Sequence, residues 1–349
     1  MIMILFAWLA QHGIAQQETL VWSDEFNGTG APDPVKWGYD LGNNGWGNNE
    51  VQNYTNLTQN ARQENGSLII TALKVNNVWT SARLLTNNKY EFKYGRVVFR
   101  AKLPVGIGTW PALWMLGENL SSKGWPACGE IDVMEHVGKN PGWVHSSVHS
   151  PSSYGGTVNT DIKFVNTFNT EFHTYQLNWT YEKLEFRIDS VLFYTYKPSV
   201  RNASTWPFDK AFFIIMNIAM GGNWGSAPQY ETGGLKNGIE PSLYQATMEV
   251  DYVRVYQYPA GVGDPRGSNE GDALQPIVTP NPSNGKILVS LPAGYPVQGG
   301  VYNLMGINVC PFTSNKSTLD LDLSTLPRGL YLLSINSRGK TNTQKIVLN

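Results

Sequence analysis

The stretch Glu130-Ile131-Asp132-Val133-Met134-Glu135 places three carboxylates in six positions, with apolar residues between them. These apolar residues predict a buried β-strand. Side chains alternate between the two faces of a strand, so Glu130 and Asp132 share one face, whereas Glu135 would point to the other. A single β-bulge returns Glu135 to the first face. We therefore predict a bulged strand whose three carboxylates line a cleft while Ile131 and Val133 face the core.

The spacing of these acids suits acid–base chemistry on a glycosidic bond. Strand geometry puts the backbones of Glu130 and Glu135 roughly 13 Å apart. Their side chains can close that gap to the ~5–5.5 Å that separates the carboxyl groups of a retaining glycoside hydrolase. Asp132 lies between them and can share a proton, which separates their pKa values. A calcium site or a solvated acidic edge strand is the alternative, which the intervening apolar residues disfavour because an exposed edge does not need them.

These residues, followed by His136-Val137-Gly138, resemble the active-site strand of glycoside hydrolase family 16, in the bulged Glu-x-Asp-x-x-Glu form of its laminarinase-type members. The resemblance extends over roughly residues 20–258. It implies an all-β, two-sheet jelly roll of the concanavalin-like type with an open cleft. It also implies retaining hydrolysis of internal β-1,3-glucosidic bonds in laminarin-type β-glucans, without a catalytic cofactor. Glu130 would be the nucleophile and Glu135 the acid/base, with Asp132 tuning the pair.

The composition of the 349 residues agrees with an exported all-β protein. The net charge is −1 and charged residues make up 15%, which argues against a nucleic-acid or polyanion partner. Aromatic residues make up 12% and glycine occurs 35 times, which suits Gly-rich turns and aromatic contacts to sugars, but also an ordinary β-sandwich without a ligand. No apolar run beyond the N-terminus approaches the length of a transmembrane segment. We expect a monomer.

The chain divides into four predicted parts. Residues 1–17 predict a signal peptide, because an apolar run ends in small residues just before two glutamines. A catalytic domain is expected over residues 18–259. Residues 260–275 have the Gly, Pro and acidic content of a linker. A small C-terminal β-sandwich domain is expected over residues 276–349.

The segment after the linker resembles the C-terminal sorting domain of the type IX secretion system of Bacteroidetes. The resemblance rests on its Pro280-Asn281-Pro282 start, the Gly329-Leu-Tyr-Leu-Leu333 strand and the Lys345-Ile-Val-Leu348 end. It implies export through the periplasm and outer membrane, with the secretion machinery as a partner and a secreted or cell-surface location. A sugar-binding module is the alternative, which the lack of Trp in this segment disfavours.

Trp110 and Trp114 lie four residues apart in Thr109-Trp-Pro-Ala-Leu-Trp-Met-Leu116. Pro111 favours a strand over a helix, and residues i and i+4 of a strand share a face. Two indoles beside the carboxylates would form a platform for sugar rings, whereas core packing is the alternative for an isolated Trp. The family resemblance favours the cleft. Trp125, just before the acids, is a further candidate for substrate contact.

Three polar residues are carried over from the resemblance as substrate contacts. Asn49 belongs to the Gly- and Asn-rich loop at residues 42–50, for which a plain turn is the alternative. Arg83 resembles a sugar-binding arginine of the family, and His149 a histidine that lines its cleft. His145 and His149 together could suggest a zinc site, but the sequence offers no evident third ligand.

A structural calcium ion is the metal that the resemblance implies. Glu25, near the start of the catalytic domain, and Asp251, in its last predicted strand, are the expected ligands. A capped turn around Glu25 and an Asp251 without a ligand are the alternatives. Cys128 and Cys310 fall in different predicted domains, so no disulfide is expected.

Two other functions are open at this point. Family 16 enzymes of other specificity cleave mixed-linkage β-1,3-1,4-glucan or agar-type galactan. Sulfated sugars would favour a basic cleft, which the net charge of −1 does not indicate. A non-catalytic β-glucan-binding protein on the same fold would be expected to lack Glu130 or Glu135. Both residues are present, which favours an enzyme.

Overall fold

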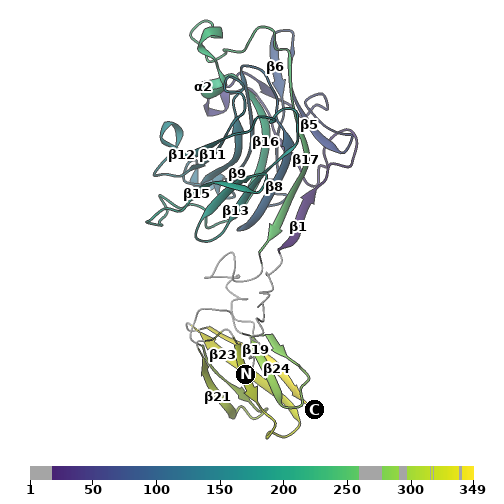
Figure 1. Cartoon of the computed structure of the whole chain (residues 1–349), viewed down its shortest axis with the longest axis vertical. Coiled ribbons are helices and arrows are strands. Elements are labelled where there is room, and N and C mark those ends of the chain that lie inside the picture. Colours follow the sequence, from purple (N-terminus) through teal and green to yellow (C-terminus); the bar gives the residue numbers. More distant parts are fainter. Residues whose placement is uncertain (1–17, 259–276, 291–296, 315, 317, 338–339) are drawn as a thin grey trace, which may run out of the picture. The chain divides into compact units, whose positions relative to one another are not determined.

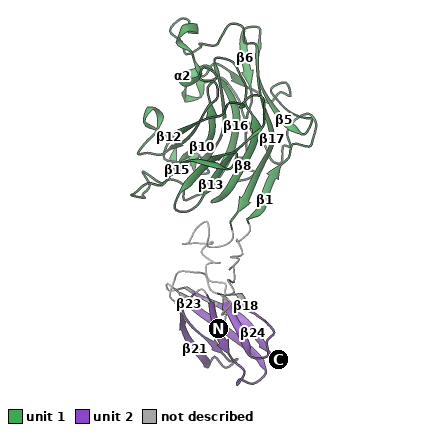
Figure 2. Cartoon of the chain, in the orientation of Figure 1, with its two compact units in different colours: residues 1–259 green, residues 260–349 purple. Residues whose placement is uncertain are grey.

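The computed structural model describes residues 18–258, 277–290, 297–314, 316, 318–337 and 340–349. The predicted signal peptide and linker lie outside these residues. Contacts within the chain separate it into two compact units, residues 1–259 and 260–349 (Figure 2). Every helix in the described part is a single short turn, and none has the length and apolar character needed to cross a membrane.

The first unit is a sandwich of two β-sheets (Figure 1). The larger sheet has ten strands, and β3 and β6 are its parallel pair among the described residues. In spatial order its strands are β15 (Val191–Tyr196), β14 (Leu184–Ile188), β13 (His173–Trp179), β8 (Gly95–Lys102), β17 (Gln245–Gln257), β5 (Ser67–Val75), β6 (Val78–Ser81) and β3 (Asn53–Tyr54), with β1 (Thr19–Asp24) paired to β17 and β4 (Ala61–Glu64) to β5.

The smaller sheet has seven antiparallel strands and carries the acidic stretch near its centre. In spatial order they are β12 (Asn159–Phe164), β11 (Trp143–His149), β10 (Glu130–His136), β9 (Thr109–Gly117), β16 (Phe212–Met220), β7 (Arg83–Leu85) and β2 (Gly38–Asp40). The short helical turns are η1 (Gly45–Gly47), α1 (Leu120–Lys123), η2 (Gly155–Thr157), α2 (Gly222–Gly225) and η3 (Pro228–Tyr230).

The hydrophobic pattern of the strands explains how the two sheets pack. The sequence of β16 is apolar at almost every position and predicts a fully buried strand, and all nine of its residues are buried. Val97 and Phe99 of β8 and Leu113 of β9 come from different sheets and share one core. Inward-facing residues of both sheets thus form a single apolar layer. The predicted two-sheet jelly roll is confirmed.

The second unit is a separate small β-sandwich with its own core, which includes Val289, Val301, Leu333 and Ile346. Both of its sheets are antiparallel. One sheet holds β18 (Ile277–Thr279), β19 (Lys286–Ser290) and β22 (Thr318–Asp322), and the other β21 (Asn308–Ser314), β20 (Val297–Tyr302), β23 (Gly329–Ser337) and β24 (Lys340–Leu348). Cys128 and Cys310 are free thiols, as expected.

Candidate active site

The acidic strand β10 contains the predicted bulge. Against β9, Asp132 pairs with Trp114 but Met134 already pairs with Leu113, so Val133 is the extra residue. The bulge leaves the carbonyl of Val133 without a regular ladder partner, and Ser146 of β11 donates a hydrogen bond to it over 2.7 Å. The pairing with β11 shifts at the same place. The bulge therefore turns the end of β10, with Glu135, toward the face that carries Glu130 and Asp132.

Apolar side chains of β10 anchor this geometry in the core. Ile131, Val133 and Met134 are buried and belong to the large core between the sheets. The carboxylate face of the same strand is different: Asp132 is buried, whereas Glu130 and Glu135 are each partly exposed. The two catalytic candidates thus stay open to solvent on a strand that is otherwise held rigidly.

Two indole N–H groups hold the glutamates. Trp125 donates its Nε1–H to Oε2 of Glu130 over 2.9 Å. Trp110 donates its Nε1–H to Oε1 of Glu135, also over 2.9 Å. The sequence predicted Trp110 as part of a sugar-stacking platform and Trp125 as a further candidate for substrate contact. The structure gives each of them a positioning contact to a carboxylate as well, because the indole ring is amphipathic.

His149 lies between two of the acids. Its Nε2 atom is 3.2 Å from Oδ2 of Asp132 and 3.5 Å from Oε1 of Glu130. His149 pairs with Glu130 across β10 and β11, so strand register fixes this contact. The predicted substrate contact His149 therefore lies on the face that carries the acids, with its ring directly against them.

Ionising all three carboxyl groups together costs free energy, because burial disfavours their charged forms and they repel one another. Burial, reinforced by repulsion from Asp132, raises the pKa of Glu130 and of Glu135 to about 8. Burial also raises the pKa of Asp132 well above its usual range. His149 and the Trp125 N–H favour the charged form of Glu130. This arrangement can present a carboxylate at Glu130 next to a carboxylic acid at Glu135.

Three residues of this group could also hold a metal ion. Glu130, Asp132 and His149 each offer one ligand atom, and these atoms lie within 4.8 Å of one another. The indole N–H of Trp125 already occupies one oxygen of Glu130, which suits a proton-sharing cluster. His145 is not a member of this group among the described residues, and its ring lies edge-on to Trp224 with 4.8 Å between centroids.

Arg83 of β7 lies between the indole of Trp114, on the same sheet, and the indole of Trp46, in η1. Its guanidinium carbon is 4.7 Å from the ring centroid of Trp114 and 4.9 Å from that of Trp46. Its Nε atom is 3.0 Å from Oδ2 of Asp40. Arg83 of β7 pairs with Asn217 of β16, and β16 also pairs with β9, so a single strand separates Arg83 from Trp114. The predicted substrate contact therefore belongs to a cation–π stack, in which Trp46 was missed. The Gly-rich loop that contains Trp46 was the available signal.

A buried hydrogen-bonded chain, also missed from sequence, supports Trp114. The indole N–H of Trp114 donates to Oδ1 of Asn217 over 2.7 Å, and Nδ2 of Asn217 donates to the hydroxyl of Tyr54 over 3.0 Å. The Tyr54 hydroxyl in turn donates to Glu50 over 3.3 Å. Burial raises the pKa of Glu50. Fully connected polar chains of this kind restrict side-chain rotamers, so Trp114 is held in one orientation.

The predicted contact residue Asn49 lies on an exposed loop that is bonded to α2. Its Nδ2 atom donates to Oδ1 of Asn223 over 2.8 Å. Asn49 also has a φ of 56°, a left-handed conformation that Asn tolerates better than most residues. The backbone N–H of Asn223 donates to Asn48, which ties the loop down further. Asn49 therefore stands at the rim of the first unit and not among the acids.

Comparison with known proteins identifies the first unit. The family described as glycosyl hydrolases family 16 matches residues 48–252. The chain belongs to glycoside hydrolase family 16. A β-glucanase of Rhodothermus marinus is 45% identical over 254 residues, which cover 68% of this chain and 85% of that protein. A glucan endo-1,3-β-glucosidase of Cryptopygus antarcticus is 37% identical and covers 68% of this chain and 92% of that protein.

Solved structures agree with the assignment of this family 16 hydrolase. The crystal structure of a laminarinase from Flavobacterium sp. UMI-01 superposes with a TM-score of 0.63 and is 43% identical. The match covers 68% of this chain and all of that one. These likenesses confirm the sandwich fold and the enzyme class that the sequence predicted.

The second unit of the family 16 chain is an export signal. The family described as a secretion system C-terminal sorting domain matches residues 278–349. The protein is therefore exported and is secreted or displayed at the cell surface, as the sequence predicted.

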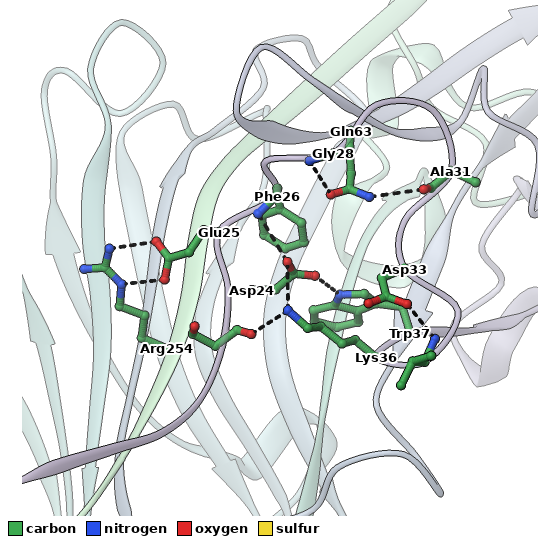
Figure 3. Close-up of polar contacts among 12 residues, drawn as sticks. Asp24, Glu25, Phe26, Gly28, Ala31, Asp33, Lys36, Trp37, Gln63 and Arg254 are labelled. Atoms are coloured by element: carbon green, nitrogen blue, oxygen red, sulfur yellow. Dashed lines mark hydrogen bonds and ion pairs between the residues drawn. The ribbon is translucent and has the colours of Figure 1, made fainter.

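The predicted calcium ligands of this family 16 chain do not fit a metal ion. Glu25 accepts two hydrogen bonds from Arg254, of 2.9 and 2.7 Å (Figure 3). Asp251 lies 2.5 Å from an Nη atom of Arg100. Each carboxylate is thus neutralised by an arginine, which would repel a cation brought to the same oxygens. Calcium binding by Glu25 and Asp251 therefore stays a prediction, which these arginine contacts disfavour.

The neighbouring Asp24 is also satisfied by the protein itself (Figure 3). It accepts hydrogen bonds from Nζ of Lys36 at 3.3 Å and from the indole N–H of Trp37 at 2.8 Å. The backbone N–H of Phe26 donates to it as well. This network ties the first turn of the domain to Lys36 and Trp37.

Proposed function

We propose that this family 16 enzyme hydrolyses internal β-1,3-glucosidic bonds of laminarin-type β-glucans with retention of configuration. The observation that supports it most is the bulged strand β10, which puts Glu130 and Glu135 on one solvent-open face, each with an indole N–H on one carboxyl oxygen. The named relatives act on β-glucans, which favours that substrate class.

In this mechanism Glu130 attacks the anomeric carbon while Glu135 protonates the departing glycosidic oxygen. The bond to the leaving sugar breaks and a glycosyl ester on Glu130 forms. Glu135, now a carboxylate, takes a proton from a water molecule, and that water releases the sugar from Glu130. Asp132 holds a proton near Glu130 and limits the charge of the cluster. No cofactor is needed for either step.

Contacts on the β9, β16 and β7 side support a neutral sugar chain. Trp114 and Trp46 offer apolar ring faces, and Arg83 offers donors between them. The charge of Arg83 is balanced by Asp40, 3.0 Å away. We infer that this side binds glucose rings by stacking and hydrogen bonding, and that Asn49 contributes at its rim.

The division of labour follows the two units. Residues 18–259 would carry the hydrolase, residues 260–275 would connect the units, and residues 276–349 would engage the type IX secretion machinery. We propose that the enzyme acts as a monomer.

The deciding assay measures the initial release of reducing ends from laminarin, barley mixed-linkage glucan and agarose by the purified enzyme under one condition. Laminarin should be the fastest substrate, and NMR of early products should show β-anomers. Faster cleavage of mixed-linkage glucan or agarose would overturn the specificity, and early α-anomers would overturn retention. Glu130→Gln is the inactive control for contaminating hydrolases.

A further inference from the structure

An exposed apolar strip lies on strands β11 and β12. Trp143 is 43% exposed, Ile162 46% and Phe164 50%. The rings of Trp143 and Phe164 touch, with centroids 5.2 Å apart and planes inclined by 55°. Three large apolar side chains side by side in solvent are costly unless they contact something.

Strand register places this strip on the face that carries the acids. Glu135 pairs with His145, and His145 pairs with Ile162, so these three residues form one row across β10, β11 and β12. Trp143 and Phe164 pair in the next row on the same face, because side chains alternate along each strand. On β12, Thr160 is also on this face and accepts a hydrogen bond from Ser147.

The alternate residues of β12 point the other way. Asp161 interacts electrostatically with Tyr194 of β15, which belongs to the larger sheet. Its neighbours Thr160 and Ile162 must therefore face away from the larger sheet, toward the side where the carboxylates lie. The strip thus lies on the carboxylate face of the smaller sheet and not in the sandwich core.

Aromatic contacts extend from the acid Glu135 to His145, which pairs with Ile162 of the strip. Trp110 donates to Glu135, and the ring of Trp224 lies edge-on to Trp110 with centroids 5.5 Å apart. Trp224 also contacts His145, the neighbour of Ile162 across the strands. Two strand spacings separate Glu135 from Ile162, about 10 Å. The strip therefore lies two strands away from Glu135 on the same face of the sheet.

We propose that Trp143, Ile162 and Phe164 form a distal subsite for the glucan chain, on the side of β10 opposite to Arg83 and Trp114. This inference rests on the proposed β-glucanase function. A long neutral glucan that crosses the acids in this direction would lay the apolar faces of its sugar rings on the two aromatic rings. Short oligosaccharides would not reach the strip. The subsite would therefore act on affinity for polymer and not on bond cleavage itself.

The test compares Trp143→Ala and Phe164→Ala with wild type on two substrates, laminarin and the shortest β-1,3-gluco-oligosaccharide that wild type cleaves. We expect KM for laminarin to rise roughly three- to tenfold in each variant, the size of one aromatic contact. We expect kcat on laminarin, and kcat/KM on the short substrate, to stay within twofold. Trp143→Phe keeps a ring and should restore most of the affinity.

Tyr244→Ala is the matched control, because Tyr244 is 63% exposed and lies over Lys74 of the larger sheet. It should leave both substrates unaffected. An unchanged KM for laminarin in the strip variants would overturn the subsite, as would an equal loss on the short and long substrates, which indicates a structural role. A change from dimer to monomer in sedimentation with unchanged KM would assign the strip to self-association instead. Failure of wild type to cleave laminarin at all would instead overturn the proposed function.

Discussion

Trp110 donates its indole N–H to Oε1 of Glu135 over 2.9 Å, so a residue of β9 positions the proposed acid on β10. The two residues are not directly opposite in the ladder, since Glu135 pairs with Ala112. The contact spans the gap diagonally, which a large side chain can reach. This hydrogen bond favours the charged form of Glu135 and opposes the effect of burial.

Trp110→Phe should therefore lower kcat on laminarin by roughly tenfold or more, because a hydrogen bond to a charged group contributes about 1.5–3 kcal/mol. It should also move the basic limb of the kcat/KM profile to higher pH, because Glu135 loses a contact that lowers its pKa from an already raised value of about 8. Initial rates between pH 5 and 10 measure both effects. Trp224→Phe, which changes the adjoining ring, is the control. A Trp110→Phe enzyme with an unshifted basic limb would contradict this assignment.

The roles of the two glutamates can be separated by chemical rescue. Glu130→Gln and Glu135→Gln should each lower turnover by at least about 10²–10⁴. Azide needs no general base, so Glu135→Ala should regain activity with azide and yield a β-glycosyl azide. Glu130→Ala should yield the α-azide, because azide then replaces the nucleophile directly. Product NMR distinguishes the two anomers, and the reverse pattern would exchange the roles.

The acid cluster should reduce stability at neutral and alkaline pH. The pKa of Glu135 is about 8 in the fold against an ordinary value of 4.5, so the native state binds more protons than the unfolded chain between these values. The stability gained from protonated Glu135 is fully present below pH 4.5 and is lost as pH rises through 8. Glu135→Gln removes this titration. The variant should exceed wild type in Tm at pH 8.5 by several degrees, and much less at pH 4.5. An equal Tm difference at both pH values would refute the linkage.

His136 should have the opposite pH dependence. Burial lowers the pKa of this side chain to about 4, and its Nε2 accepts a hydrogen bond from the backbone N–H of Gly142. Between pH 6.5 and 4 the unfolded chain binds the proton first, so stability falls as pH falls. His136→Gln, whose amide oxygen can still accept from Gly142, should flatten that slope. Urea unfolding at pH 4.5, 5.5 and 6.5 measures it, and parallel slopes for variant and wild type would disprove the effect.

A chain that ends after Tyr258 should fold and keep its hydrolase activity but lose export. The first unit has its own core, and the sorting domain begins at residue 278. Activity on laminarin should stay within about twofold of the full chain, whereas enzyme in the culture medium of the native host should disappear. Loss of activity in the purified truncated protein, or its continued secretion, would contradict the division between the units.

The sequence predicted the acidic strand correctly because its signal is local. Alternation along one strand spans only a few residues. Glu135 lies five positions after Glu130, so a bulge is needed to bring the two side chains to one face. The class of fold was implied by the family resemblance that this strand carries, and apolar runs such as β16 agree with it. The sorting domain could also be predicted from the sequence, because its motifs lie within short segments.

Contacts between distant segments were decided only by the tertiary structure. The family resemblance implied Glu25 and Asp251 as metal ligands. In the structure, Arg254 contacts Glu25 and Arg100 contacts Asp251. The arginine on Glu25 lies 229 positions away in the chain. Which partner meets a carboxylate depends on the register between strands, and no short stretch of sequence encodes that register.

The environment of the aromatic residues shows the same limit. The spacing of Trp110 and Trp114 predicted a shared face, but not that one indole would hold an acid and the other an amide of Asn217. Local sequence determines which face a side chain takes, because backbone geometry repeats every two residues along a strand. Its partner is determined by packing, because packing brings together residues that are far apart in the chain.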